Sequence, residues 1–260
     1  MKVVLLAGGK GTRISEESGV RPKPMIEIGE MPILWHIMKL YSYYGFNEFI
    51  ICCGYKGYMI KEWFADYFLH MSDVTFDFTD GNKMIVHNNV AEPWKVTLID
   101  TGEDSMTGYR IKQIQRYIPQ DESFMLTYGD GVSNVNLSDL LRFHKEHGKT
   151  VTMTTVQPSG RFGMVDITGD GTIARFVEKP QGDGGWINAG FMVLNYEIFQ
   201  YLSEDENLVF EDKPMKQLVQ KKELVAYKHY DFWQPMDTLR DKVRLNGLWK
   251  MQTAPWKVWG

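Results

Sequence analysis

The sequence predicts an α/β fold, in which a mostly parallel but mixed central sheet is flanked by helices. Short apolar runs alternate with longer segments of helical periodicity, which is typical of this class. The first apolar run stops at a cluster of glycines, as a buried parallel strand does where it opens into a ligand loop. No linker, repeat or low-complexity stretch divides the chain. We therefore expect residues 1–260 to form a single domain.

The spacing of apolar residues places the elements along the chain. The first strand covers residues 3–7, and Pro32 begins a helix that ends at Gly45. An aromatic stripe at helical spacing in residues 58–69 is expected in the core. The other predicted elements are strands at 49–53, 96–100, 124–128 and 151–156 and helices at 137–147 and 239–249.

Two segments depart from this alternation and predict antiparallel pairs. In residues 76–89, polar and apolar residues alternate around a turn signal at residues 80–82. In residues 165–177, two short strands flank a second turn signal at residues 169–171. We expect a small antiparallel excursion from the central sheet.

Composition argues against several classes of function. The 260 residues are 43% hydrophobic and carry a formal net charge of −4, whereas a nucleic-acid-binding domain shows a basic stripe. No apolar run approaches the roughly 20 residues of a membrane span, and the start lacks the pattern of a signal peptide. We expect a cytoplasmic protein with neither a nucleic-acid nor a membrane partner.

We expect neither the cysteines nor the histidines to take part in catalysis. Cys52 and Cys53 are adjacent, which is a poor geometry for a disulfide, and we expect both to be buried as small hydrophobes. The six histidines include His36, His144 and His147 on predicted helices, where partial burial or exposure is expected.

The most informative segment is the loop after the first strand. Gly8, Gly9 and Gly11 lack side chains, so backbone N–H groups there can approach a polyphosphate closely. Arg13 and Lys23 can add charge-assisted hydrogen bonds to phosphate oxygens. Prolines on both sides of Lys23 hold it on a stiff segment. The loop therefore predicts a phosphate site.

Two standard glycine loops do not fit this spacing. A dinucleotide fingerprint needs a small residue where the chain has Ile14. A P-loop needs Ser or Thr directly after its lysine, but Lys10 is followed by Gly11. A nicotinamide-dependent dehydrogenase is correspondingly disfavoured.

The loop and its surroundings resemble the sugar-nucleotide pyrophosphorylases, which join a sugar 1-phosphate to a nucleoside triphosphate. Their signature is Leu-Ala-Gly-Gly-x-Gly-Thr-Arg followed by Pro-Lys-Pro, and the chain matches it at residues 6–13 and 22–24. Further motifs resemble the cytidylyltransferases of that family, at residues 52–57, 104–108, 127–131 and 232–238.

The resemblance implies a Rossmann-like nucleotidyltransferase fold. Residues 1–135 would mainly bind the nucleotide, residues 136–240 the sugar phosphate, and residues 241–260 would form a C-terminal helix and tail. The implied reaction joins CTP and α-D-glucose 1-phosphate to give CDP-glucose and pyrophosphate, by in-line displacement at the α-phosphorus. Such a product suits deoxysugar synthesis for surface glycans such as the lipopolysaccharide O antigen.

Two alternatives stay open. One is a uridylyl- or thymidylyltransferase with the same chemistry, and the other is a non-catalytic regulatory subunit that binds a nucleotide sugar. The resemblance also implies a homo-oligomer, with a hexamer as one form of it. The apolar tail around Trp249 and Trp256 is expected to pack on the core or on another subunit.

Asp130 and Asp237 are the candidate metal ligands. Asp130 follows a predicted strand, at the edge where open α/β sheets bind ligands, and its carboxylate suits Mg²⁺. Asp237 precedes a predicted helix, so the sequence alone favours a helix N-cap. The resemblance assigns Mg²⁺ to both aspartates and makes them catalytic together with Arg13 and Lys23.

The remaining site residues divide between nucleotide and sugar. Small residues in the loop 101–110 could read a pyrimidine edge, and a single donor or acceptor there can discriminate cytosine from uracil. For the sugar phosphate, the resemblance implies Gly163, Glu178, Lys179 and Asn188. The implied nucleotide-binding residues are Leu6, Ala7, Gly8, Gly9, Gly11, Thr12, Arg13, Lys23, Thr107, Gly108, Arg110 and Gly129.

Overall fold

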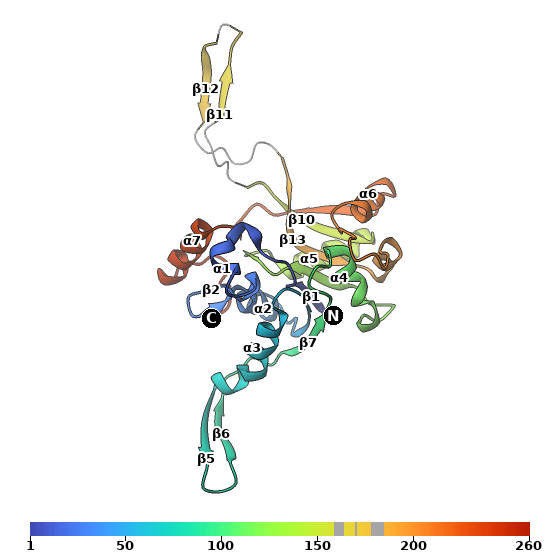
Figure 1. Ribbon diagram of the computed structural model, residues 1–260. Coiled ribbons are helices and arrows are strands. Elements are labelled where there is room, and N and C mark those ends of the chain that lie inside the picture. Colours follow the sequence, from blue (N-terminus) through green and yellow to red (C-terminus); the bar gives the residue numbers. More distant parts are fainter. Residues whose placement is uncertain (159–163, 170, 178–184) are drawn as a thin grey trace.

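A seven-stranded sheet forms the centre of the computed structural model, which describes residues 1–158, 164–169, 171–177 and 185–260 (Figure 1). In sheet order the strands are β14 (Leu224–Lys228), β10 (Val151–Val156), β13 (Ile187–Leu194), β8 (Phe124–Tyr128), β1 (Val3–Leu6), β4 (Glu48–Cys53) and β7 (Lys95–Asp100). β13 runs antiparallel to both neighbours, and the other adjacent pairs are parallel. The predicted sheet of mostly parallel but mixed direction is thus confirmed.

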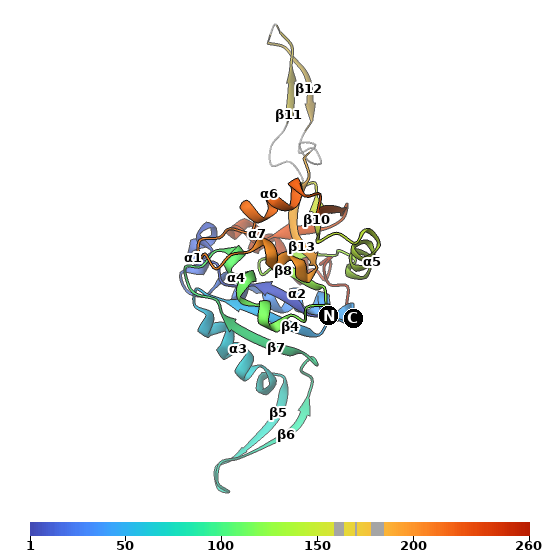
Figure 2. The same cartoon turned by 90° about the vertical axis from the view of Figure 1, so that its right-hand side faces the viewer.

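Helices cover both faces of this sheet (Figure 2). Along β1 the side chains alternate, so that Val3 and Leu5 join one hydrophobic core while Val4 and Leu6 join the other. The first core is closed by α2 (Ile33–Tyr43), α3 (Gly57–His70), α5 (Leu137–His147) and α7 (Leu239–Lys250). The second is closed by α4 (Thr107–Gln113), η4 (Tyr196–Tyr201) and α6 (Lys213–Gln220). Among the described residues, none of the helices combines the length and apolar character that a bilayer crossing requires.

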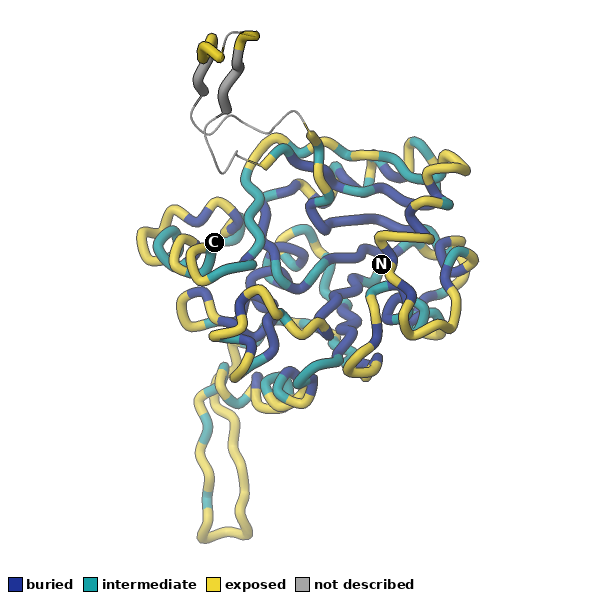
Figure 3. The backbone as a smooth tube through the Cα atoms, turned by 45° about the horizontal axis from the view of Figure 1, so that its top comes forward, coloured by how far each residue is buried: buried dark blue, intermediate teal, exposed yellow. Residues whose placement is uncertain are grey.

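Both predicted antiparallel pairs are present. β5 (Ser72–Asp77) and β6 (Lys83–Asn89) form a hairpin that projects from the body of the molecule, and every residue of β6 is exposed (Figure 3). β11 (Met164–Ile167) pairs with β12 (Ile173–Val177). Neither hairpin adds a strand to the central sheet.

The C-terminal tail packs on the first core, which decides between the two expectations for it. Trp256 is fully buried and stacks on Trp249 of α7, with the ring centroids 6.3 Å apart. His36 on α2 lies in the same cluster, and its Nε2 is 2.9 Å from the carbonyl oxygen of Ile28 in β2 (Glu27–Ile28).

Two of the expectations for histidine were wrong. His36 and His144 are buried, because α2 and α5 turn these positions toward the sheet. Burial lowers the pKa of His36 from 6.5 to about 4. The cysteines lie as expected: Cys52 and Cys53 are buried in β4 without a disulfide, and burial raises the pKa of the Cys53 thiol to about 11.

Candidate active site

The glycine loop leaves the carboxyl end of β1 between two neighbouring strands. Its start is tied to both sides, since Tyr55 N–H donates to the carbonyl of Gly8 at 3.1 Å and Gly129 N–H donates to that of Leu6 at 3.0 Å. Gly11 has a φ of +64°, in the left-handed region that favours glycine. The loop then enters η1 (Thr12–Ile14), which carries Arg13. The sequence between β1 and η1 therefore gives a backbone-lined loop at the ligand-binding edge of the sheet.

Arg110 lies beneath this loop. Its side chain is buried and donates to the carbonyls of Gly8 at 3.1 Å and Cys53 at 3.2 Å. It also donates to the Thr101 hydroxyl at 2.6 Å and the Gly102 carbonyl at 2.7 Å. Burial lowers the pKa of the Arg110 guanidinium. In this structure Arg110 braces the loop from below, and a direct contact with the nucleotide stays a prediction.

The four predicted catalytic residues meet in one ion-pair cluster. The Lys23 ammonium lies 2.7 Å from Asp130 Oδ2 and 2.6 Å from Asp237 Oδ1. Arg13 reaches the other oxygen of Asp237, at 2.6 Å. The Lys23 side chain is only 8% exposed and that of Asp237 14%, so water screens the contact between these two weakly.

Strand pairing explains how residues so distant in sequence meet. β9 (Gly131–Ser133) begins directly after Asp130 and pairs antiparallel with β15 (Trp233–Pro235), which ends just before Asp237. A backbone hydrogen bond of 2.8 Å from Met236 N–H to the carbonyl of Asp130 fixes the register. Lys23 enters from η2 (Lys23–Met25), after a proline with a φ of −65°.

The start of α7 leaves Asp237 available for the site. The N-cap is the next residue, Thr238, whose hydroxyl accepts from Asp241 N–H while the Asp241 carboxylate accepts from Thr238 N–H. The sequence alone favoured Asp237 as the N-cap, which is one residue before the observed N-cap.

The donor set at this cluster fits a small divalent cation. Asp130 and Asp237 already share one cation, the Lys23 ammonium, and offer the hard oxygen ligands that Mg²⁺ prefers. Within the described ranges, no group of three or more acidic, histidine or cysteine side chains could hold a metal ion. Two carboxylates are enough where substrate phosphates and water supply the other ligands, as they commonly do for Mg²⁺.

Residues 2–241, which include this cluster, match the nucleotidyl transferase family. Over 259 residues and the full length of both chains, the sequence is 56% identical to the glucose-1-phosphate cytidylyltransferase of Salmonella typhimurium. The chain belongs to the glucose-1-phosphate cytidylyltransferase family. A probable member from Bacillus subtilis is 45% identical, again over the full length of both chains.

Solved structures show the same fold at lower identity. HddC from Yersinia pseudotuberculosis has a TM-score of 0.66 at 24% identity, covering 95% of this chain and 99% of that one. A putative glucose-1-phosphate thymidylyltransferase from Bacillus anthracis has a TM-score of 0.69 at 14% identity, covering 95% and 94%. Nucleotidyltransferases of the family generally use a divalent metal, in accord with the paired aspartates.

The other predicted nucleotide-binding positions surround the glycine loop. Gly9 and Thr12 are exposed on it, and a Cβ on Gly9 would meet no heavy atom within 4 Å. Gly129 packs closely under β1, where a Cβ would lie 2.9 Å from the carbonyl oxygen of Leu6. Gly108 packs as closely on Leu208. Ala7 is buried at the start of the loop.

Three residues predicted for the sugar phosphate, Gly163, Glu178 and Lys179, lie outside the described residues. The fourth, Asn188, lies at the start of β13, whose antiparallel direction brings it to the same edge of the sheet as Asp130. Its side chain donates to the Tyr128 hydroxyl at 3.2 Å.

Two residues that sequence reasoning did not single out, Tyr128 and Glu211, contact the predicted positions Thr107 and Asn188. Tyr128 ends β8, two positions before Asp130, and its hydroxyl donates to Glu211 Oε1. The other oxygen of Glu211 accepts from the Thr107 hydroxyl at 2.6 Å. The place of Tyr128 beside the Gly-Asp-Gly motif was a usable signal. Glu211 had none, because its partners lie more than 80 residues away in the chain.

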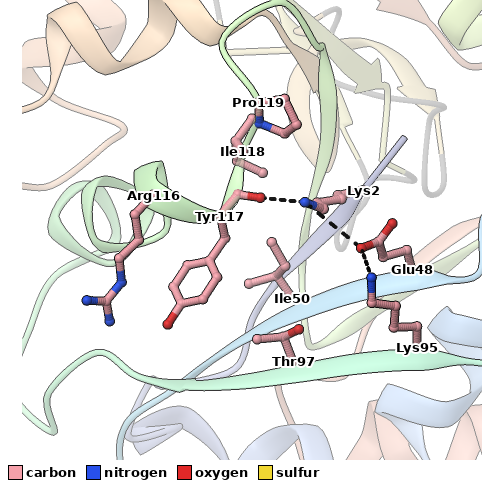
Figure 4. Close-up of a pocket in the computed structure, with 9 residues that line it drawn as sticks. All are labelled: Lys2, Glu48, Ile50, Lys95, Thr97, Arg116, Tyr117, Ile118 and Pro119. Atoms are coloured by element: carbon pink, nitrogen blue, oxygen red, sulfur yellow. Dashed lines mark hydrogen bonds and ion pairs between the residues drawn. The ribbon is translucent and has the colours of Figure 1, made fainter.

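A hollow of about 420 Å³ lies at the opposite edge of the sheet, where β1, β4 and β7 begin (Figure 4). There Glu48 lies between Lys2 at 3.9 Å and Lys95 at 3.0 Å, and Lys2 also donates to the carbonyl of Tyr117. The Lys95 side chain is 77% exposed, so its pair with Glu48 is an ordinary surface pair of little energetic weight. Among the described residues, none of those implied for the cytidylyltransferase reaction lines this hollow.

Proposed function

We propose that the chain transfers a cytidylyl group from CTP to α-D-glucose 1-phosphate, giving CDP-glucose and pyrophosphate. The observation that carries this proposal is the ion-pair cluster of Lys23, Asp130 and Asp237 beside the glycine loop. The choice of CTP and glucose 1-phosphate rests on the names of the full-length relatives.

The reaction needs positioning and charge stabilisation more than acid–base chemistry. A phosphate oxygen of glucose 1-phosphate attacks the α-phosphorus of CTP in line with the bond to the leaving pyrophosphate. That oxygen is already ionised near neutral pH, so no protein base has to remove a proton. Arg13 and Lys23 stabilise the negative charge that moves onto the leaving group. To do so, Lys23 exchanges its carboxylate partners for phosphate oxygens.

Asp130 and Asp237 would hold the divalent ion, which we take to be Mg²⁺. When bound, the ion neutralises charge on the phosphates of the nucleotide. Both carboxylates lie within 2.7 Å of the Lys23 ammonium, so an ion bound there competes with Lys23 for the same oxygens. The Lys23 ammonium would then be available to the phosphates of the substrate.

The substrates divide between the two halves of the chain. Residues 1–135 supply the glycine loop and Thr107, Gly108 and Arg110 for the nucleotide. Residues 136–240 supply Asn188, with Gly163, Glu178 and Lys179, for the sugar phosphate. Residues 241–260 complete the fold with α7 and the tail.

We further propose a cytoplasmic homo-oligomer, with a hexamer as one form of it. The exposed side chains of the projecting hairpin support association, because Phe76, Phe78 and Met84 present apolar surface that a monomer leaves in water. A cytoplasmic site gives access to CTP. The product would feed deoxysugar synthesis for surface glycans.

The test is an assay of purified protein with Mg²⁺ and glucose 1-phosphate, in which CTP, UTP, dTTP, ATP and GTP are offered separately. Pyrophosphate release and the sugar nucleotide formed are measured together. Preference for CTP with CDP-glucose as product is expected. Preference for UTP or dTTP would keep the mechanism and replace the base, whereas no release with any nucleotide or sugar 1-phosphate would indicate a non-catalytic binding subunit.

A further inference from the structure

A chain of side-chain hydrogen bonds connects the proposed nucleotide loop with the proposed sugar residue. It runs from Asn188 Nδ2 to the Tyr128 hydroxyl at 3.2 Å, and from that hydroxyl to Glu211 Oε1. From the other side, the Thr107 hydroxyl donates to Glu211 Oε2 at 2.6 Å. Both arms therefore end on the same carboxylate.

The surroundings hold each member in place. Thr107 begins α4, and its hydroxyl oxygen accepts from Phe210 N–H at 2.9 Å, so the side chain has one donor left for Glu211. The Tyr128 ring lies on Gly190 of β13, which has a φ of +80° and where a Cβ would come within 2.5 Å of the ring. Burial raises the pKa of Tyr128, and the nearby Glu211 carboxylate adds to this, so the phenol keeps its proton and remains a donor.

Glu211 suits this junction because of its charge and symmetry. An ionised carboxylate has only acceptor oxygens and can take one hydrogen bond from each hydroxyl. An amide at the same position has one acceptor oxygen and one NH₂ group, so one of the two hydroxyls loses its acceptor and faces a donor instead. The link therefore depends on the carboxylate and not only on the size of the side chain.

We propose that Glu211 is a positioning residue that couples the nucleotide loop to the sugar-phosphate residues. The inference rests on the proposed function, because it takes Thr107 as a nucleotide contact and Asn188 as a sugar contact. Ordering one arm by substrate fixes the carboxylate and thereby orders the other arm. Glucose 1-phosphate then binds more tightly when the nucleotide is present, and the nucleotide binds more tightly when glucose 1-phosphate is present.

The test measures this coupling directly by calorimetry. The Kd of glucose 1-phosphate is measured with Mg²⁺, in the presence and absence of α,β-methylene-CTP, whose carbon bridge blocks departure of pyrophosphate. The coupling ratio is the Kd without the nucleotide analogue divided by the Kd with it. We expect this ratio to be at least about 5 in the unmodified protein, at the lower end of typical coupling between sites. In Glu211→Gln the ratio is expected to fall to about 1, because only one arm keeps its acceptor.

Two further variants separate coupling from folding. Tyr128→Phe keeps the ring on Gly190 but removes the hydroxyl, so it is also expected to abolish the coupling. Glu204→Gln is the matched control, since Glu204 accepts from Gln113 of α4 at 3.1 Å, from the same stretch of chain as Glu211, without touching Tyr128. Its coupling ratio is expected to be that of the unmodified protein.

Each result of the coupling measurements either supports or overturns the proposed role of Glu211. Loss of coupling in Glu211→Gln and Tyr128→Phe, with retention in Glu204→Gln, supports the positioning role. Coupling that survives in either of the first two variants, or that is absent from the unmodified protein, overturns it. An unmodified protein that binds neither ligand would overturn the proposed function and this inference with it, whereas synthesis of CDP-glucose without coupling would overturn the inference alone.

Discussion

The two ends of α7 bury polar side chains in opposite ways. Just before its first turn, Asp237 belongs to an ion-pair cluster in which every charge has a partner and Arg13 stays 73% exposed. At its last turn, Trp249 belongs to an aromatic cluster that closes around His36. The first end keeps charges that reach solvent, whereas the second buries the neutral rings of His36 and Trp256 completely. The difference separates the proposed active site from a region that packs as part of the core.

The aromatic cluster should dominate stability. Trp256→Ala removes a fully buried ring that stacks on Phe232 and Trp249, and we expect the free energy of unfolding to fall by about 3–5 kcal/mol. Denaturant titration measures this change. Met251→Ala, in the same tail but 65% exposed, is the control and should change stability by less than about 0.5 kcal/mol. Equal effects of the two substitutions would mean that the tail does not seal the core.

The ion-pair cluster should dominate activity. Asp237→Asn or Asp130→Asn removes a carboxylate of the proposed metal site, and kcat is expected to fall by about 10²-fold to 10³-fold. Steady-state pyrophosphate release measures kcat, and a denaturant titration checks that the fold is kept. Glu48→Gln is the control, since Glu48 is also a carboxylate between two lysines but lies at the amino edge of the sheet. A comparable loss of kcat in Glu48→Gln would remove the distinction between the two edges.

His36 should make stability depend on pH. Its pKa is lowered to about 4 in the folded state, against 6.5 for the unperturbed side chain, because burial disfavours the charged form. The unfolded chain therefore binds the proton more readily. The contribution of His36 is complete above about pH 6.5 and is lost as the pH falls toward 4, a loss of about 3 kcal/mol.

The hydrogen bonds of His36 agree with a neutral ring. Nε2 donates to the carbonyl of Ile28, and Nδ1 accepts from Trp256 Nε1 at 3.4 Å, which a protonated Nδ1 could not do. His36→Phe should flatten the dependence of unfolding free energy on pH between 7 and 4.5. His87→Gln, in the exposed strand β6, should leave that dependence as it is. An unchanged pH profile in His36→Phe would contradict the buried neutral histidine.

Two glycines of one loop offer the finest comparison. A Cβ on Gly8 would lie 2.2 Å from a guanidinium nitrogen of Arg110, which is held by several oxygens and cannot move aside, whereas a Cβ on Gly9 would meet nothing within 4 Å. Gly8→Ala is expected to lower the free energy of unfolding by about 1–3 kcal/mol, and Gly9→Ala by much less. Thermal or denaturant unfolding of the pair measures the difference. Equal stabilities would show that Arg110 does not brace the loop.

Much of the architecture was predictable because local patterns carry it. The helix at 137–147 and the strands at 124–128 and 151–156 were placed at their observed bounds, since buried apolar residues at fixed spacing leave few alternatives. The convergence of Lys23, Asp130 and Asp237 was expected from their motifs. The burial of His36 and the hydrogen bonds of Glu211 were not, because each depends on contacts between distant segments, and the N-cap was placed one residue too early.

By itself, the sequence determined the class of fold, the glycine loop, and the identity of the cations and carboxylates beside it. The fold class and the glycine loop follow from side-chain chemistry and short-range spacing, whereas the role of Asp237 is what the resemblance to the sugar-nucleotide pyrophosphorylases implies. Only the tertiary structure showed how these charges are brought together and that both carboxylates pair with Lys23. The pairing of β9 with β15 sets Asp237 beside Asp130, although the two lie over 100 residues apart. Only the tertiary structure, too, placed Arg110 under the loop and Glu211 between its two donors, because burial and hydrogen-bond partners depend on packing that no local pattern encodes.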